Sequence, residues 1–194
     1  HALSLAIVAA LAMPMAHAQE AGDEAEAPKS AAAEMSSVTV TARKREETLQ
    51  DVPIAVTAFT ADALDRLNVE DLGDLGAFVP TLTISAARGS SSTVTAYIRG
   101  IGQSDPLWGV DPGVGIYLDD VYIARPQGAL LDVFDVERIE VLRGPQGTLY
   151  GKNTIGGAIK YVSKELPQEM EGFASLTVGT HDQLDVKAAL GGPL

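Results

Sequence analysis

The chain contains no cysteine among its 194 residues. This absence excludes disulfide frameworks, thiolate zinc sites, iron–sulfur clusters and cysteine nucleophiles. Basic residues are also scarce, because 14 Lys and Arg stand against 26 Asp and Glu and leave a net charge of −12. No stretch gathers positive charge into a face that could neutralise a row of phosphates, so we expect no nucleic-acid partner.

No apolar run is long enough to cross a membrane as a helix. The uncharged run over residues 5–13 is nine residues long, whereas a bilayer core needs about 20. The run resembles the apolar centre of a secretory signal peptide, and Ala16-His17-Ala18 is a small-x-small cleavage pattern. We therefore expect residues 1–18 to be a signal peptide that lacks its own start, and the mature protein to be exported. A buried amphipathic helix is the alternative, but the run has no polar face.

Catalytic signatures are absent from the remaining sequence. Cleavage after residue 18 leaves His181 as the single histidine, so a Ser-His-Asp triad or a multi-histidine metal site is hard to build. The glycine-rich stretch 143–157 resembles a phosphate-binding loop, but Gln146 and Asn153 stand where such a loop needs Gly and Ser or Thr. The sequence predicts no enzyme activity, no cofactor and no metal site.

A low-complexity region follows the leader. Residues 19–34 consist mainly of Ala, Glu, Gly, Pro and Ser without aromatic residues, so they cannot bury enough surface to offset ordering. We expect residues 19–47 to form a flexible tether. Within it lie five residues that favour an extended backbone, namely Val38, Thr39, Val40, Thr41 and Ala42. This segment is either the first strand of the following domain or a mobile peptide that adds to a sheet edge of another protein.

The region after residue 47 mixes short helices and short strands. An apolar strand is expected over 51–59, and Thr60 can cap a helix with Leu64 and Leu67 on one face. A second short helix is expected to begin at Asn68 and to end at Pro80. Further strands are expected near 82–84, 94–99, 114–118, 138–142 and 158–162. This order predicts an α+β fold with a short mixed sheet.

The C-terminal residues alternate in polarity. In residues 171–180, Ala174, Leu176 and Val178 fall on one face of a strand, and residues 182–190 repeat the pattern. Segments of about ten residues with one apolar face are the weak strand signature of outer-membrane barrels. A soluble hairpin is the alternative that these residues alone favour.

Three sequence blocks carry a family resemblance. They are Ile98–Gly102 with an I-R-G pattern, Val114–Tyr122 with a V-x-x-Y-x-D-x-V-Y pattern, and the long block Val136–Gly151 continued by Asn153–Ile159. Together they resemble the plug domain of TonB-dependent outer-membrane receptors of the iron-complex or siderophore type. Two positions depart from the family pattern: Asp120 replaces a common Gly, and Lys160 replaces a frequent Asn.

The resemblance implies a domain organisation. Residues 48–166 would form an α+β plug domain inside a 22-stranded barrel, and residues 167–194 would begin that barrel, which this chain leaves incomplete. Residues 38–42 fall on the Ton box, the peptide that pairs with TonB in the periplasm, which favours the mobile-peptide interpretation. The protein would lie in the bacterial outer membrane, with plug and tether facing the periplasm.

The resemblance also implies a function: active uptake of a scarce small molecule, most often a ferric siderophore, driven by TonB and its inner-membrane complex. Candidate substrate-sensing loop residues are Arg88, Ser90, Ser91, Gln103, Ser104 and Trp108. Candidate charges facing the barrel are Arg99, Glu140 and Arg143, with ordinary pairs inside the domain as their alternative. A soluble periplasmic plug-like binding or signalling module is the alternative function.

Overall fold

The computed structural model describes residues 37–87, 90, 92–104, 107 and 109–193. The expected signal peptide and most of the expected tether lie outside the described residues. Among the residues described, none of the helices is both long and apolar enough to cross a membrane.

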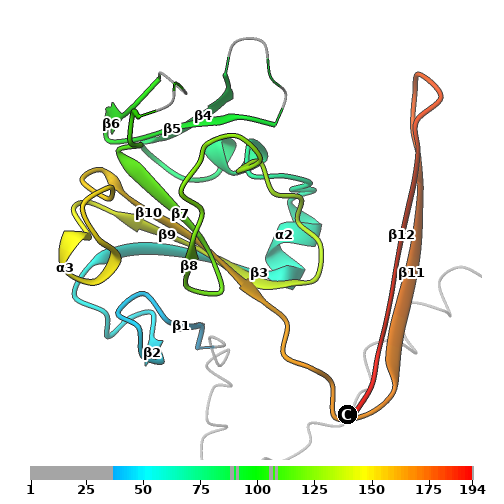
Figure 1. Ribbon diagram of the computed structural model, residues 1–194. Coiled ribbons are helices and arrows are strands. Elements are labelled where there is room, and N and C mark those ends of the chain that lie inside the picture. Colours follow the sequence, from blue (N-terminus) through cyan, green and yellow to red (C-terminus); the bar gives the residue numbers. More distant parts are fainter. Residues whose placement is uncertain (1–36, 88–89, 91, 105–106, 108, 194) are drawn as a thin grey trace, which may run out of the picture. The chain divides into compact units, whose positions relative to one another are not determined.

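A five-stranded mixed sheet forms the centre of the domain, in the order β3-β9-β10-β7-β8 (Figure 1). Its strands are β3 (Ala55–Thr60), β7 (Val114–Leu118), β8 (Val121–Tyr122), β9 (Val136–Arg143) and β10 (Gly157–Ser163). Strand β10 pairs antiparallel with β9 and parallel with β7. Most residues of β9 and β10 are buried, as expected for central strands covered on both faces. The predicted α+β class with a short mixed sheet is confirmed.

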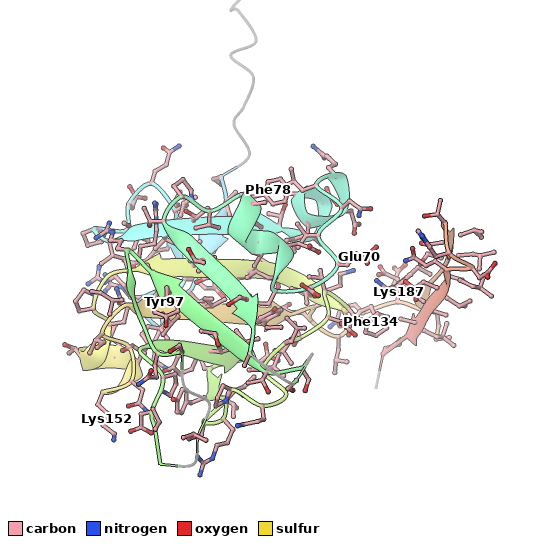
Figure 2. All side chains as sticks on the ribbon, turned by 90° about the horizontal axis from the view of Figure 1, so that it is seen from above. Glu70, Phe78, Tyr97, Phe134, Lys152 and Lys187 are labelled. Atoms are coloured by element: carbon pink, nitrogen blue, oxygen red, sulfur yellow. The ribbon has the colours of Figure 1, made fainter. Side chains whose placement is uncertain are left out.

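The first face of the central sheet is covered by short helices and a second sheet. The covering elements are α2 (Ala61–Arg66), the 3₁₀ helix η1 (Asp74–Ala77), β4 (Leu82–Ala86), β5 (Val94–Ile98) and β6 (Ile101–Gly102). Strands β4 and β5 cross the central strands obliquely (Figure 2). One buried hydrophobic cluster joins these layers, and it includes Leu64, Leu75, Ile98, Ile139 and Ile159.

The second face is covered by the N-terminal residues and one helical turn. These elements are β1 (Thr39–Val40), β2 (Glu47–Thr48) and α3 (Gly147–Tyr150). Neighbouring residues of a strand point to opposite faces, so Leu142 and Ala158 pack into this second cluster while Val141 and Ile159 pack into the first. The 38–42 segment therefore belongs to the covering of the second face.

Helix α2 follows the sequence prediction at its start and differs at its end. The Thr60 hydroxyl accepts a hydrogen bond from the Ala63 N–H at 3.4 Å and caps the helix. Asn68 was expected to begin a second helix, but it has a φ of 52°. Its N–H donates to the Asp65 carbonyl, and the Val69 N–H donates to the Leu64 carbonyl. This pair of bonds is a Schellman motif, in which Asn tolerates the left-handed conformation and terminates the helix.

The end of α2 and the second helix also differ from the sequence prediction. Leu67 does not share the buried face of Leu64, because it ends the helix and is 37% exposed. The second helix is only the 3₁₀ turn Asp74–Ala77. The Asp74 carboxylate accepts from the Glu70 and Asp71 N–H groups ahead of that turn.

The C-terminal strands β11 (Glu171–Val178) and β12 (Leu184–Gly191) form an antiparallel hairpin. His181 and Asp182 occupy its turn with φ values of 62° and 61°. Apolar residues meet across the pair, as Leu176 does with Val186. A lone two-stranded hairpin is marginally stable in water, so this hairpin requires neighbouring strands or an apolar surrounding. Its alternation agrees with the expected first strands of an outer-membrane barrel.

Gly157 begins β10 at a place where only glycine fits. Its φ is 150°, and a Cβ there would overlap the Leu142 carbonyl oxygen of β9. We predict that Gly157→Ala destabilises the domain by more than about 2 kcal/mol, because either the β9–β10 pairing or the backbone must shift. The measurement is the urea concentration at which the domain becomes protease-sensitive in the full-length protein.

The matched control is Gly147→Ala. A Cβ at Gly147, the first residue of α3, meets no atom within 4 Å. Its urea midpoint should stay at the wild-type value, and a shift equal to that of Gly157→Ala would contradict this explanation.

Candidate functional site

The 38–42 segment docks on the domain with alternate side chains turned inward. Val40 and Ala42 are both 0% exposed, whereas Thr39 faces outward. Strand β1 pairs antiparallel with β2 through two residues of each strand, in a sheet separate from the central one. In this structure the segment is therefore the first strand of the domain, held by side-chain packing and by a very short ladder.

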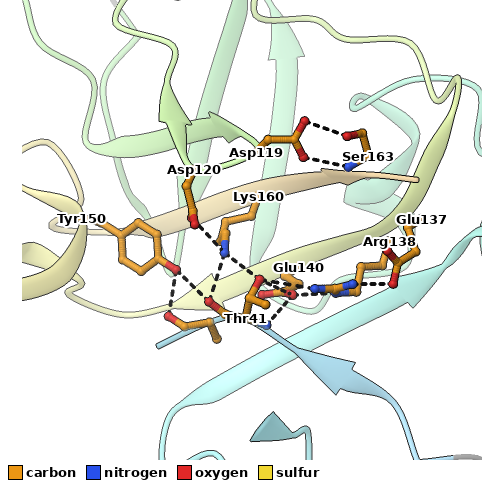
Figure 3. Close-up of polar contacts among 10 residues, drawn as sticks. Thr41, Asp119, Asp120, Glu137, Arg138, Glu140, Tyr150, Lys160 and Ser163 are labelled. Carbon is orange, nitrogen blue, oxygen red and sulfur yellow. Dashed lines mark hydrogen bonds and ion pairs between the residues drawn. The ribbon is translucent and has the colours of Figure 1, made fainter. Parts of the chain in front are cut away.

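Thr41 makes several of the polar contacts of the segment (Figure 3). Its N–H donates to Glu140 Oε1 at 2.7 Å, and its hydroxyl donates to the same oxygen at 3.2 Å. Lys160 Nζ donates to the Thr41 hydroxyl oxygen at 2.8 Å and to the Thr41 carbonyl oxygen at 3.0 Å. The Glu140 and Lys160 side chains are 0% and 1% exposed. One residue of the segment thus contacts a buried anion and a buried cation.

Glu140 and Lys160 each have an ion-pair partner of opposite charge. Arg138 Nε donates to Glu140 Oε1 at 2.9 Å, and Lys160 Nζ forms an ion pair with Asp120 at 3.1 Å. Burial of Asp120 opposes its ionisation, but the hydrogen bond and charge of Lys160, together with the charge of Lys44, hold the pKa of that carboxyl below its usual range. The buried Glu140 is therefore paired with Arg138, and the buried Lys160 with Asp120, as buried charges require.

Tyr150 of α3 closes over the end of the segment. Its hydroxyl donates to the Ala42 carbonyl oxygen at 2.8 Å. Burial, with the nearby charges of Asp120 and Glu140, raises the pKa of the Tyr150 phenol, so the phenol keeps its proton and remains a donor. Its ring packs edge-on against Tyr117 at a centroid distance of 5.0 Å. Burial likewise raises the pKa of Tyr117 to about 12.

The cluster was only partly anticipated from the sequence. Glu140 was expected to face the barrel, but its Oε1 bonds Thr41 and Arg138 within the domain, which corresponds to the alternative interpretation. Lys160 and Tyr150 were not named as candidates. The available signal was a lysine and a glutamate inside otherwise apolar strands, where a charge needs a partner.

The remaining charge candidates lie elsewhere. Arg99 has a φ of 54° in the turn between β5 and β6. Its guanidinium lies close to Gly144, since a Cβ there would be 3.8 Å from Arg99 Nη1. Arg143 Nε is buried without a hydrogen-bond partner among the described residues.

The loop candidates are only partly described. Arg88, Ser91 and Trp108 lie outside the described residues. Ser90 accepts a hydrogen bond from the Thr93 hydroxyl at 2.9 Å in the connection between β4 and β5. Gln103 and Ser104 follow β6 directly. Their role in substrate sensing stays a prediction.

The family profile described as "TonB-dependent Receptor Plug Domain" matches residues 48–158. The chain is 31% identical to the pesticin receptor of Yersinia pestis over 144 residues, and 26% identical to the vitamin B12 transporter BtuB of Vibrio vulnificus (strain YJ016) over 145 residues. These alignments cover 73% and 75% of this chain but only 20% and 23% of the relatives.

A solved structure shows the same fold. The ferric yersiniabactin uptake receptor FyuA from Yersinia pestis superposes with a TM-score of 0.64 at 30% identity, covering 73% of this chain and 22% of that receptor. The chain thus spans about a fifth to a quarter of the length of these proteins.

We predict that Tyr150→Phe loosens the 38–42 segment. The substitution removes the hydroxyl that donates to the Ala42 carbonyl, a loss of about 1 kcal/mol, or about fivefold faster hydrogen exchange of the Thr41 amide. Hydrogen exchange on the full-length protein measures this rate.

Tyr97→Phe removes the same atom from β5, in the layer on the opposite face. It should leave the Thr41 amide unchanged. If both variants exchange at the wild-type rate, the Tyr150 hydroxyl does not hold the segment.

Proposed function

The chain belongs to the TonB-dependent receptor plug domain family, and on that basis we propose that it is the plug-containing portion of an outer-membrane transporter for ferric siderophores. The match of residues 48–158 to the family profile carries this proposal. The relatives are receptors and transporters, which accounts for the lack of catalytic motifs. The plug and the tether would face the periplasm, and the barrel would begin with β11 and β12.

Iron-complex uptake is favoured by the names of the similar proteins. FyuA is a ferric yersiniabactin uptake receptor, and another relative is the iron-regulated outer membrane virulence protein of Vibrio cholerae. Other relatives are a vitamin B12 transporter and a hemin receptor. We therefore propose a ferric siderophore as the cargo, with cobalamin and haem as the competing classes.

We propose that the 38–42 segment binds TonB by strand addition. Its alternation of Val and Thr presents a regular backbone edge, and its own ladder with β2 involves only Thr39 and Val40. Beyond this ladder the Val38 carbonyl accepts from the Leu49 N–H, so few bonds between the two strands must break before the segment can pair with another protein. A strand added edge to edge carries its load through several hydrogen bonds at once, which suits transmission of force from TonB to the plug.

We propose that Arg99 and Arg143 face carboxylates of the barrel. The buried, unpartnered Nε of Arg143 supports this, because an orphaned guanidinium nitrogen calls for an acceptor beyond the described residues. Glu140 does not share this role here, since its Oε1 accepts from Thr41 and Arg138. The loops that hold Ser90, Gln103 and Ser104 remain the proposed substrate sensors.

We predict that Val40→Pro in the full-length receptor abolishes cargo uptake and leaves cargo binding intact. Proline removes a main-chain donor and fixes φ, so the segment cannot add to a TonB strand. Uptake of ⁵⁵Fe-loaded siderophores by cells, and their binding at 4 °C, are the two measurements.

Val40 is also buried in the domain, so the control must separate docking from TonB pairing. Thr48→Pro disrupts the same β1–β2 ladder from its other strand and leaves residues 38–42 intact. It should retain uptake. Wild-type uptake by Val40→Pro, or equal loss in Thr48→Pro, would contradict TonB pairing through this segment.

A cargo panel tests the substrate class. Cells that depend on this receptor should accumulate iron from ferric siderophores and should gain neither cyanocobalamin nor haemin. Deletion of the receptor should abolish iron accumulation and should leave the amounts of cyanocobalamin and haemin in the cells unchanged. Accumulation of cyanocobalamin or haemin in its place would reassign the cargo without affecting the TonB proposal.

A further inference from the structure

Glu140 and Lys160 are opposite partners on neighbouring strands. They pair in register across the antiparallel strands β9 and β10, so their side chains leave the same face of the central sheet. Directly opposite residues in such a pair have Cβ atoms about 5 Å apart. Both side chains are buried, yet the structure contains no ion pair between these two described residues.

Thr41 occupies the place of that missing ion pair. The Lys160 ammonium directs its contacts to the Thr41 carbonyl, the Thr41 hydroxyl and Asp120, which matches the three protons it carries. Glu140 Oε1 accepts from the Thr41 N–H and from Arg138 Nε, while its Oε2 has no hydrogen-bond partner among the described residues. Thr41 therefore lies between two opposite charges. Its N–H donates to the Glu140 carboxylate, and its carbonyl accepts from the Lys160 ammonium.

Departure of the segment would leave both charges short of partners. Lys160 would lose two of its three acceptors, and Glu140 would lose both contacts from Thr41 while Oε2 remains free. Glu140 would keep its ion pair with Arg138, and Lys160 would keep its ion pair with Asp120. The hydrogen-bonding positions that Thr41 had filled would still be left unsatisfied in a buried setting, which is unfavourable. Because the two groups already face each other across one strand pair, a rotation of their side chains would bring them into direct contact.

We propose that Thr41 is a charge-bridging latch: docked, it holds Glu140 and Lys160 apart, and on release these two charges pair directly with each other. The two charges are then paired in the released state as well, so the segment has two defined states, docked and released, and does not detach gradually. We infer that the switch serves to present the segment to TonB, and this part rests on the proposed function. The switch itself is a property of the domain.

The same strand provides a matched control for Thr41. Thr39 has the same chemistry and lies two residues away, but it is exposed and its side chain makes none of the contacts of this cluster. Thr→Val removes one hydroxyl and keeps the β-branched shape at either position. Thr41→Ser keeps the hydroxyl and serves as the rescue variant.

The first experiment measures release by thiol labelling in the full-length receptor. The chain has no cysteine, so Val40→Cys, with any later cysteine changed to Ser, places a single thiol at a position that is 0% exposed when docked. A maleimide then reacts only when the segment leaves. We expect Thr41→Val to raise the labelling rate at least fivefold, and Thr39→Val and Thr41→Ser to stay within twofold of the parent. Equal rates for Thr41→Val and Thr39→Val would overturn the latch.

The second experiment tests the direct pair in the released state. Residues 37–42 of the full-length receptor are replaced by Gly and Ser, and hydrogen exchange of the β9 and β10 amides is followed. Glu140→Gln and Lys160→Met should each accelerate exchange, and the double variant should be no faster than the faster single variant, since either change removes the same pair. If the acceleration of exchange in the double variant equals the product of the accelerations in the two single variants, the direct pairing is overturned.

Neither measurement requires TonB or cargo. If the thiol labelling rates of Thr41→Val and Thr39→Val are equal while Val40→Pro abolishes uptake, the latch fails and the proposed function stands. If labelling responds as expected while Val40→Pro transports normally, the latch stands and TonB pairing through this segment fails.

Discussion

The structure depends on the burial of two opposite charges, Glu140 and Lys160, within a sheet that is covered on both faces. Such groups are tolerated only with close partners, and removing one partner of a buried ion pair costs about 3–5 kcal/mol. Here the partners come from Thr41, about a hundred residues earlier in the chain, together with Arg138 and Asp120. The 38–42 segment thereby supplies hydrogen bonds that the two buried charges need when it is docked.

The two faces of the central sheet are covered by hydrophobic clusters of different size. The first face carries α2, η1 and the β4–β5–β6 sheet, which share one extensive hydrophobic cluster. The second face carries a smaller cluster, which the 38–42 segment completes through Val40 and Ala42. None of residues 38–42 belongs to the first cluster, so departure of the segment would leave that cluster in place. This division suits a domain whose N-terminal strand serves as a handle.

The sequence was sufficient for the features that depend on local pattern. Four of the five central strands were predicted from their apolar runs, α2 from Thr60 as its cap, and the C-terminal hairpin from its alternation. The short edge strand β8 (Val121–Tyr122) was not predicted. The helix expected from Asn68 was wrong, because an Asn that caps the start of a helix and an Asn that ends one in the left-handed conformation look alike in a single sequence. The cluster around Thr41 could not be predicted, since its contacts join residues about a hundred positions apart and depend on the register of β9 with β10.

Photocrosslinking in living cells tests the central claim most directly, namely that residues 38–42 dock on the plug and leave it to meet TonB. A photoreactive residue replaces Thr39, which is exposed in the docked state, so the probe does not disturb the buried cluster. The account predicts an adduct with TonB that increases when a ferric siderophore is supplied. A receptor that transports its cargo while this position never forms an adduct with TonB would contradict it.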